Sequence, residues 1–246
     1  MNYNKFLIFS FLHVKSEVFD KKKRTIFSMR LCFVTGGSLA DFVLYNAEKI
    51  KNIDVVIFSY GVNGLIDFNG EITGKSENLI DLAKISLNFD CVVVAGCDTD
   101  NYGVLRCSAA VADKGRILGV CDMTHNIDGE KYDAGSGCRV FNTSKGKIGV
   151  IVDKDLYFPE VSNILSLSES DIIINVLKKV KDYLPLLMLR SSSFTSGVKI
   201  AACADNFCAI SDIKANLEFF STKRLEIVDT KIVKEYRLVA TRKRAY

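Results

Sequence analysis

The chain has 246 residues, of which 48% are hydrophobic, and it carries a formal net charge of +4 at neutral pH. This length suffices for one α/β domain with a large buried core, and the mean hydropathy of +0.16 is typical of a globular protein. Because the basic residues are scattered along the chain, we expect no nucleic-acid-binding surface. We also expect no cofactor.

The cysteines and histidines indicate a reduced, cytoplasmic protein without a metal site. None of the 8 cysteines forms a Cys-x-x-Cys pair, and several lie within apolar runs such as residues 90–97. Core thiols are therefore expected, rather than disulfide bonds or zinc ligands. The two histidines, His13 and His125, are too few for a site built from several imidazoles.

Residues 1–28 are expected to form an extension outside the domain, or to be an artefact of start-site choice. Their apolar stretch, from Phe6 to Val14, is too short to span a bilayer, and no small-residue cleavage site follows it. We therefore expect no membrane anchor. The domain is expected to occupy residues 29–246.

The first half of this domain is predicted to alternate strands with helices. Buried strands are expected at residues 31–34, 54–58 and 91–97 because these runs are short and apolar. Helices are expected between them, one capped by Ser38 and one over residues 76–87. The inward residues of these helices are predicted to be Leu39, Phe42, Val43, Ala47 and Ile50 in the first, and Leu79, Leu82, Ala83 and Leu87 in the second. Residues 107–120 are predicted to form a hairpin that turns at Asp113, Lys114 and Gly115.

The stretch from Gly146 to Glu160 predicts a strand, a sharp polar turn and a helix. Its β-branched run ends at Val152, Asp153 and Lys154 follow directly, and Pro159 suits the first turn of a helix. Such a turn, at the carboxyl end of a strand, is where α/β proteins often place a nucleophile.

The last third is predicted to be strand, helix and strand followed by an irregular segment. The strands are expected at residues 171–175 and 198–204, with a helix over residues 176–189 that is interrupted near Pro185. Residues 205–221 are expected to be less regular. The tail is basic and ends at Tyr246.

Two stretches resemble the carbon-nitrogen hydrolases of the nitrilase superfamily. The family's active-site segment reads G-x-I-G-x-x-I-C-Y-D-x-x-F-P-E, and it is matched by Gly146, Ile148, Gly149, Asp155, Phe158, Pro159 and Glu160. The hairpin at residues 107–120 resembles the family's N-S-A hairpin, and Thr124 and His125 match the Thr-His of its Y-R-K-T-H-L segment. The resemblance spans residues 29–246 and implies an α/β fold, a four-layer α-β-β-α sandwich, in which the C-terminal arm commonly packs across a dimer.

The resemblance also implies where the family's Glu-Lys-Cys triad would lie. Tyr60 stands at the position of the general base, Met123 at that of the oxyanion-binding lysine, and Asp153 at that of the nucleophile. A phenol keeps its proton near neutral pH, and a thioether has neither charge nor N–H to offer an oxyanion. Losing one member of a cooperating catalytic unit can cost on the order of a million-fold in rate. Hydrolysis of amides and nitriles is therefore expected to be absent.

The leading interpretation is a catalytically inactive homologue that acts as a binding or subunit-interaction protein. Its expected partners are a second copy of the chain, a different subunit or a small-molecule ligand. The alternative is an active hydrolase on a carbon-nitrogen bond with a rebuilt site, in which Asp153 serves as nucleophile or base. Cys121, His125 and Lys154 are the candidate neighbours of such a site.

A metal site formed by Asp122, Asp153 and Asp155 is a third interpretation, which the pattern disfavours. Carboxylates separated by one residue point the same way in an extended strand, but here they fall in a turn. No His or Cys accompanies them at ligand spacing.

Overall fold

The computed structural model describes residues 26–39, 42–43, 52–126 and 131–233. Strands in the described part are β1 (Ile26–Val34), β2 (Val55–Asp67), β3 (Val92–Asn101), β4 (Val104–Asp113), β5 (Arg116–Asp122), β6 (Arg139–Thr143), β7 (Gly146–Val152), β8 (Ile172–Val176), β9 (Ile200–Cys203), β10 (Cys208–Ser211), β11 (Leu217–Ser221) and β12 (Leu225–Val233). Helices are α2 (Phe68–Thr73), α3 (Asn78–Asn88), the 3-10 helix η1 (Asp153–Tyr157), α4 (Pro159–Leu167) and α5 (Leu184–Ser196).

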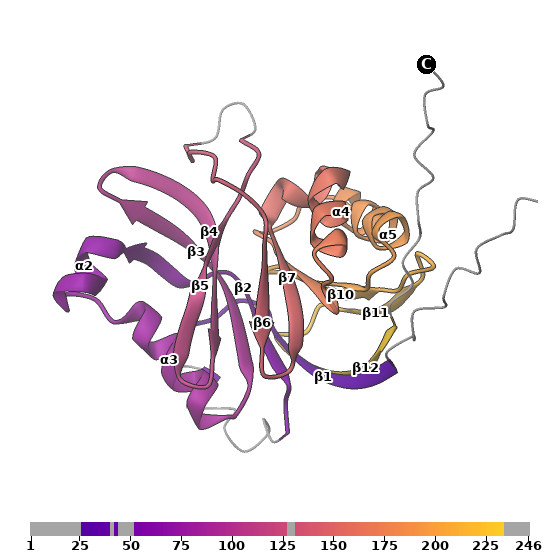
Figure 1. Cartoon of the computed structure of the whole chain (residues 1–246), viewed down its shortest axis with the longest axis horizontal. Coiled ribbons are helices and arrows are strands. Elements are labelled where there is room, and N and C mark those ends of the chain that lie inside the picture. Colours follow the sequence, from indigo (N-terminus) through magenta and orange to yellow (C-terminus); the bar gives the residue numbers. More distant parts are fainter. Residues whose placement is uncertain (1–25, 40–41, 44–51, 127–130, 234–246) are drawn as a thin grey trace, which may run out of the picture.

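The strands form two six-stranded mixed sheets. The first sheet has the order β12-β1-β2-β3-β4-β5, and the second has the order β11-β10-β9-β8-β7-β6. Strands β1, β2 and β3 run parallel to one another, as do β7, β8 and β9, while hairpins close the edge at β4–β5 and at β6–β7. Figure 1 shows α3 beside the first sheet, and α4 and α5 beside the second.

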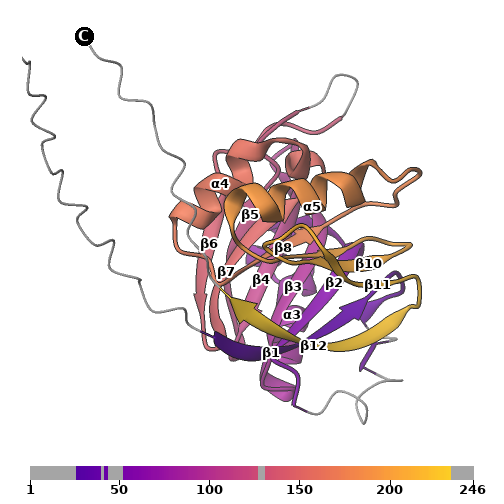
Figure 2. The same ribbon diagram turned by 90° about the vertical axis from the view of Figure 1, so that its right-hand side faces the viewer.

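Three buried clusters fill the spaces between these layers. The central cluster lies between the sheets, a second joins the first sheet to α3, and a third joins the second sheet to α4 and α5. In β8, Ile172 and Ile174 belong to the central cluster and Ile173 to the helix side, so this strand is buried on both faces. The predicted four-layer α-β-β-α sandwich is thereby confirmed, and Figure 2 shows α4 and α5 covering the second sheet.

The strand-turn-helix prediction at residues 146–160 is also confirmed, and so is the predicted hairpin turn. Strand β7 ends at Val152, η1 follows without a gap, and Pro159 occupies the first turn of α4. In the β4–β5 hairpin, Lys114 and Gly115 both have positive φ, 49° and 74°, as a two-residue primed turn requires.

Several local predictions were wrong. Residues 176–183 are not helical, because Val176 pairs in register with β7 and β9 and the chain then continues as a loop to α5. Residues 205–221 are not irregular, because they contain β10 and β11. Leu87 is 63% exposed, whereas Ile85 is buried, because the buried face of α3 is rotated from the predicted one.

Strand β1 begins at Ile26 and includes residue 29, the expected start of the domain. Residues 1–25 and most of the helix expected after Ser38, with Ala47 and Ile50, lie outside the described residues. From that helix Phe42 is buried as predicted, with its ring edge-on to Phe58 at a centroid distance of 4.8 Å, whereas Val43, also predicted to face inward, is 38% exposed. Among the described residues, no helix is long and apolar enough to cross a bilayer.

Candidate functional site

The turn after β7 directs a carboxylate into the space between the sheets. Asp153 has φ 45°, a left-handed conformation that residues other than Gly, Asn and Asp seldom adopt, and it is only 4% exposed. Its Oδ1 accepts a hydrogen bond from the backbone N–H of Lys178 at 3.1 Å, and its Oδ2 lies 3.9 Å from the Lys178 Nζ. The carboxylate is thus held by the residue two positions beyond the end of β8.

Tyr60 approaches this carboxylate from the first sheet. It follows a register shift in β2, where it pairs with Gly96 of β3, and its backbone N–H donates to the carbonyl of Leu177 at 3.3 Å. Its phenol donates a hydrogen bond to Asp98 Oδ1. Burial, together with Cys107 and Asp98 nearby, raises the pKa of Tyr60 well above its usual value, so the phenol acts as a donor and not as a base.

Met123, the third position implied by the resemblance, lies just beyond β5 and is fully buried. Its backbone is fixed on both sides, since its N–H donates to the Cys107 carbonyl and its carbonyl accepts from Gly135, each at 2.7 Å. The thioether belongs to the central cluster, which also contains Tyr60 and Tyr132. It fills space between the sheets without offering charge.

Three residues at this site, Asp98, Tyr132 and Lys178, were not predicted from the sequence. Asp98 of β3 accepts the phenols of both Tyr60 and Tyr132, the latter at 3.2 Å. Lys178 places its ammonium 3.9 Å from the centroid of the Tyr132 ring and 4.8 Å from that of Tyr60. Because residues 176–189 were predicted to be helical, Lys178 was not expected at the carboxyl end of a strand. The available signal was a charge just after a β-branched run, as at Asp153, because parallel strands gather such residues at one edge of a sheet.

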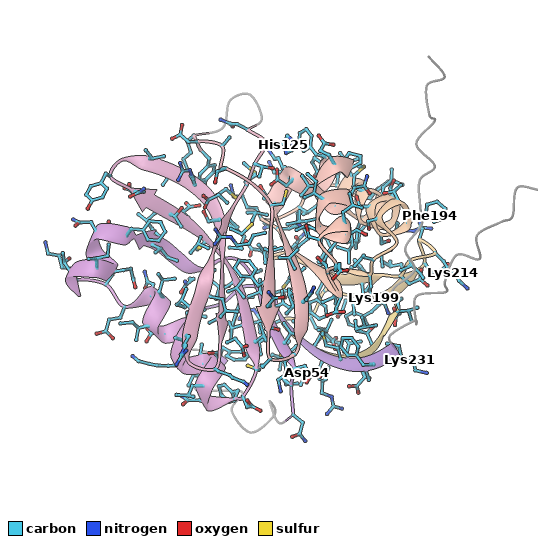
Figure 3. All side chains as sticks on the ribbon, in the orientation of Figure 1. Asp54, His125, Phe194, Lys199, Lys214 and Lys231 are labelled. Atoms are coloured by element: carbon cyan, nitrogen blue, oxygen red, sulfur yellow. The ribbon has the colours of Figure 1, made fainter. Side chains whose placement is uncertain are left out.

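His125, by contrast, belongs to a structural cluster beside the site. The Asp155 carboxylate accepts from the backbone N–H groups of Thr124 and His125, at 2.7 and 3.0 Å, and contacts the Thr124 hydroxyl and His125 Nδ1 at 3.0 and 2.9 Å. The His125 ring stacks on Phe158 at a centroid distance of 3.8 Å, and its Nε2 lies 3.5 Å from Glu160. Figure 3 labels His125, which lies in the segment after β5. All five residues match the nitrilase-type segments, and together they bind the loop after β5 to the start of α4.

The other candidate neighbours of Asp153 differ in their surroundings. Cys121 joins Met123 in the central cluster, as their shared strand parity predicts, and burial raises the pKa of its thiol to about 12. Lys154 is half-buried in η1, next to Asp153. A thiol with so high a pKa is a poor nucleophile at neutral pH.

The three carboxylates considered for a metal have separate partners. Asp122 accepts from the Ser108 hydroxyl at 2.7 Å, while Asp155 holds the Thr124–His125 backbone and Asp153 faces Lys178. In the described residues, no group of three or more His, Cys, Asp and Glu side chains is arranged to hold a metal ion.

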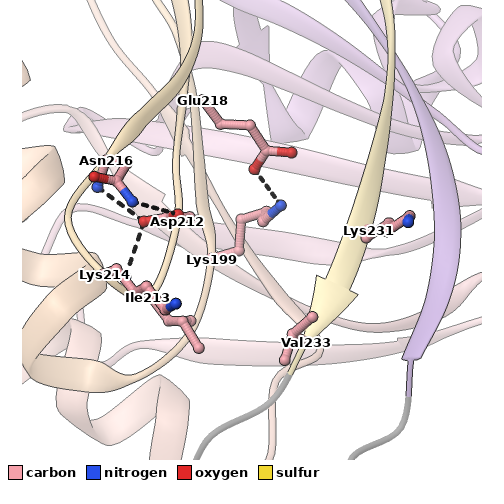
Figure 4. Close-up of a pocket in the computed structure, with 8 residues that line it drawn as sticks. All are labelled: Lys199, Asp212, Ile213, Lys214, Asn216, Glu218, Lys231 and Val233. Atoms are coloured by element: carbon pink, nitrogen blue, oxygen red, sulfur yellow. Dashed lines mark hydrogen bonds and ion pairs between the residues drawn. The ribbon is translucent and has the colours of Figure 1, made fainter.

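A pocket of about 600 Å³ lies elsewhere, near the end of β12. It contains Lys199, which donates to Glu218 and, at 2.6 Å, to Thr230, and Asp212, which accepts from the side chain of Asn216 at 3.0 Å (Figure 4). Neither Tyr60 nor Asp153 lines it, so this pocket is separate from the site between the sheets.

Comparison with known proteins agrees with this architecture. The carbon-nitrogen hydrolase family model matches residues 33–220, which is more than half of the chain. A probable nitrilase from Schizosaccharomyces pombe is 24% identical over 110 residues, which cover 42% of this chain and 40% of that protein. The matched segment thus spans less than half the length of this relative.

Solved structures share the fold at low sequence identity. Saccharomyces cerevisiae Nit3, of the nitrilase superfamily, has a TM-score of 0.71 at 13% identity, covering 89% of this chain and 97% of Nit3. A carbon-nitrogen hydrolase from Helicobacter pylori gives 0.68 at 16% identity, with 83% and 89% covered, and an amidase from Nesterenkonia gives 0.66 at 13%, with 85% and 91% covered. On the family match and this shared fold, the chain belongs to the carbon-nitrogen hydrolase family.

Proposed function

We propose that this protein is a carbon-nitrogen hydrolase homologue that does not hydrolyse amides or nitriles and acts instead by binding a ligand or another subunit. The observation that carries the proposal is the chemistry of three buried side chains, Tyr60, Met123 and Asp153, at the positions of the family triad. They supply a protonated phenol, a thioether and a carboxylate already engaged with Lys178.

Each replacement removes a different requirement of the family chemistry. A general base must lack its proton near the working pH, which the raised pKa of Tyr60 prevents. An oxyanion needs donors placed where its charge develops, and the Met123 thioether has none. The Asp153 carboxylate is a poor nucleophile toward an amide. Retained surroundings, such as the Thr124–Asp155 contacts, explain why the fold persists without the reaction.

The alternative function is hydrolysis by a rebuilt site with Asp153 as nucleophile or base. Its best support is the left-handed conformation of Asp153, because strained backbone recurs at active sites. The residues expected to assist Asp153 argue against this function. His125 is hydrogen-bonded to Asp155, and burial raises the pKa of Cys121 to about 12. We therefore favour loss of hydrolysis.

Ammonia release tests this choice. The purified full-length chain would be incubated with short aliphatic amides and nitriles, with the Nesterenkonia amidase as the positive control for the amides and a nitrile-hydrolysing relative for the nitriles. We expect ammonia at the level of the buffer blank for both the wild type and Asp153→Asn. Robust release that disappears in Asp153→Asn would refute the proposal and establish the alternative.

The subunit-interaction part of the proposal is supported by an apolar surface on α4 and α5. Those two helices pack on each other, and their exposed large apolar side chains include Ile164, Leu167, Leu184 and Leu187. A second copy of this chain, or a related subunit, would remove these side chains from water. We propose that this face carries the contact.

Light scattering coupled to size-exclusion chromatography tests the contact. We expect the wild type to be a dimer or larger, and Leu167→Asp to shift it toward monomer, because Leu167 is 82% exposed on this face. Ile72→Asp is the matched control, since Ile72 is 81% exposed on α2. A monomeric wild type at micromolar concentration would exclude self-association and leave a different subunit, sought by co-purification, as the partner.

All 8 cysteines are free thiols, which supports the proposed cytoplasmic location.

A further inference from the structure

A lysine ammonium of this chain occupies the space enclosed by the candidate site. The Nζ of Lys178 lies 3.9 Å from the centroid of the Tyr132 ring, 4.8 Å from that of Tyr60 and 3.9 Å from Asp153 Oδ2. A cation within about 6 Å of an aromatic centroid is attracted by the negative face of the ring. Two rings and a buried carboxylate therefore form a cage suited to an ammonium, and here the chain fills it.

The two aromatic walls of this cage are oriented by a second carboxylate, Asp98. Both tyrosine rings are buried, and their phenols donate to the two oxygens of one carboxylate, Asp98. Asp98 also lies 3.7 Å from the ammonium of Lys131. Because Asp98 orients Tyr60 and Tyr132 together, the rings should keep their positions when the lysine side chain leaves.

The backbone around Lys178 is fixed, whereas its side chain reaches solvent. The N–H of Leu177 donates to Cys203 at 2.9 Å, that of Lys178 to Asp153 at 3.1 Å, and that of Val180 to Asn206 at 3.1 Å. The Lys178 side chain is 31% exposed. Rotation about its own torsions can thus withdraw the ammonium and leave the cage otherwise unchanged.

We propose that this cage, formed by Tyr60, Tyr132 and Asp153, binds the primary ammonium group of a small alkylamine, with Lys178 as a built-in competitor for the same place. The inference rests on the proposed function, because a site that does not hydrolyse its ligand can retain it. The ligand class follows from the present occupant, an ammonium on an unbranched methylene chain. n-Butylammonium reproduces that side chain and contains no amide or nitrile.

Calorimetric titration of the full-length protein with n-butylammonium tests the proposal. A tethered competitor has an effective concentration in the millimolar range or above, so its removal should strengthen ligand binding markedly. We expect Lys178→Ala to bind n-butylammonium at least tenfold more tightly than the wild type. n-Butanol, of similar length but without charge, should not bind detectably to either protein.

Three further variants distinguish the cage from nonspecific effects. Lys178→Met keeps a long side chain in the cage and should bind no more tightly than the wild type, while Tyr132→Leu in the Lys178→Ala background should lose most of the gain. Lys178→Ser is a second truncation in case Lys178→Ala does not fold, which circular dichroism would reveal.

The outcomes separate this proposal from the loss of hydrolysis. Folded truncations that bind no n-butylammonium, bind it no better than the wild type, or bind n-butanol equally would each overturn the cage. None of these results depends on turnover, because n-butylammonium is not a substrate for carbon-nitrogen hydrolysis by the family chemistry. Ammonia release from amides would overturn the proposed function and leave the binding result standing.

Discussion

Replacing Asp155 with alanine should detach the loop after β5 from the turn after β7. The carboxylate is 2% exposed and accepts the backbone N–H groups of Thr124 and His125, while also contacting the Thr124 hydroxyl and the His125 ring. Among the described residues, no other side chain accepts hydrogen bonds from both of these N–H groups. The variant therefore removes the group that connects two segments of the candidate site.

The magnitude follows from the two backbone donors. A buried N–H that loses its acceptor costs about 1–3 kcal/mol. Thr124 and His125 are half-buried, so water can replace part of each lost bond. We expect Asp155→Ala to lower the free energy of unfolding by about 2–4 kcal/mol, a large part of the 5–15 kcal/mol typical of a folded protein.

Equilibrium unfolding in urea measures this change. The midpoint should fall while the m-value stays constant, since the surface exposed on unfolding is nearly the same. Asp81→Ala is the control, because the exposed Asp81 side chain forms an ion pair with Lys84 at 3.0 Å that is worth about 0–1 kcal/mol. If Asp155→Ala costs no more than Asp81→Ala, the role assigned to Asp155 is wrong.

Three other predictions concern packing and thiols. Gly96→Ala should destabilise by about 1–3 kcal/mol in the same assay, since an added Cβ would lie 2.7 Å from Tyr60 Cα; a change within experimental error would contradict this packing. Iodoacetamide followed by mass spectrometry should label Cys138, which is partly exposed, before Cys121; early labelling of Cys121 in the folded protein would instead favour a rebuilt active site. Burial raises the pKa of Cys121 from 9.0 to about 12, so its contribution to stability is complete below pH 9 and is lost as the pH rises toward 12. Between pH 9 and pH 12, the unfolding free energy of the wild type should therefore fall more steeply than that of Cys121→Ala, by about 1.4 kcal/mol per pH unit. Equal slopes for the two proteins would count against a buried neutral thiol.

Several individual strands, turns and helices were predictable because their determinants are local. The strand β7 is specified by a β-branched run that ends before Asp153, and the helix α4 begins at Pro159, which suits a first helical turn. Neither element depends on distant segments of the chain. The Lys114–Gly115 turn is equally local. The pairing of two sheets was not readable from such patterns, and it was reached through the family resemblance.

What escaped prediction depends on contacts between distant segments. Lys178 is 25 residues from Asp153 in sequence, and they meet because β7 and β8 are parallel neighbours whose carboxyl ends share one edge. Asp98 lies just beyond the strand predicted at residues 91–97, and no local pattern indicated that the phenols of Tyr60 and Tyr132, from two other segments, would donate to it. The strands β10 and β11 escaped notice because they have four and five residues, too few for a period to emerge.

The proposed loss of hydrolysis rests on three side chains, Tyr60, Met123 and Asp153, which cannot perform the family chemistry at the positions they occupy. The most direct test is the rate of ammonia release from amides and nitriles by the purified wild type beside Asp153→Asn. We expect the wild type and Asp153→Asn to give ammonia traces that coincide with the blank while the positive controls release ammonia. A wild-type rate clearly above the blank, and abolished in Asp153→Asn, would contradict it.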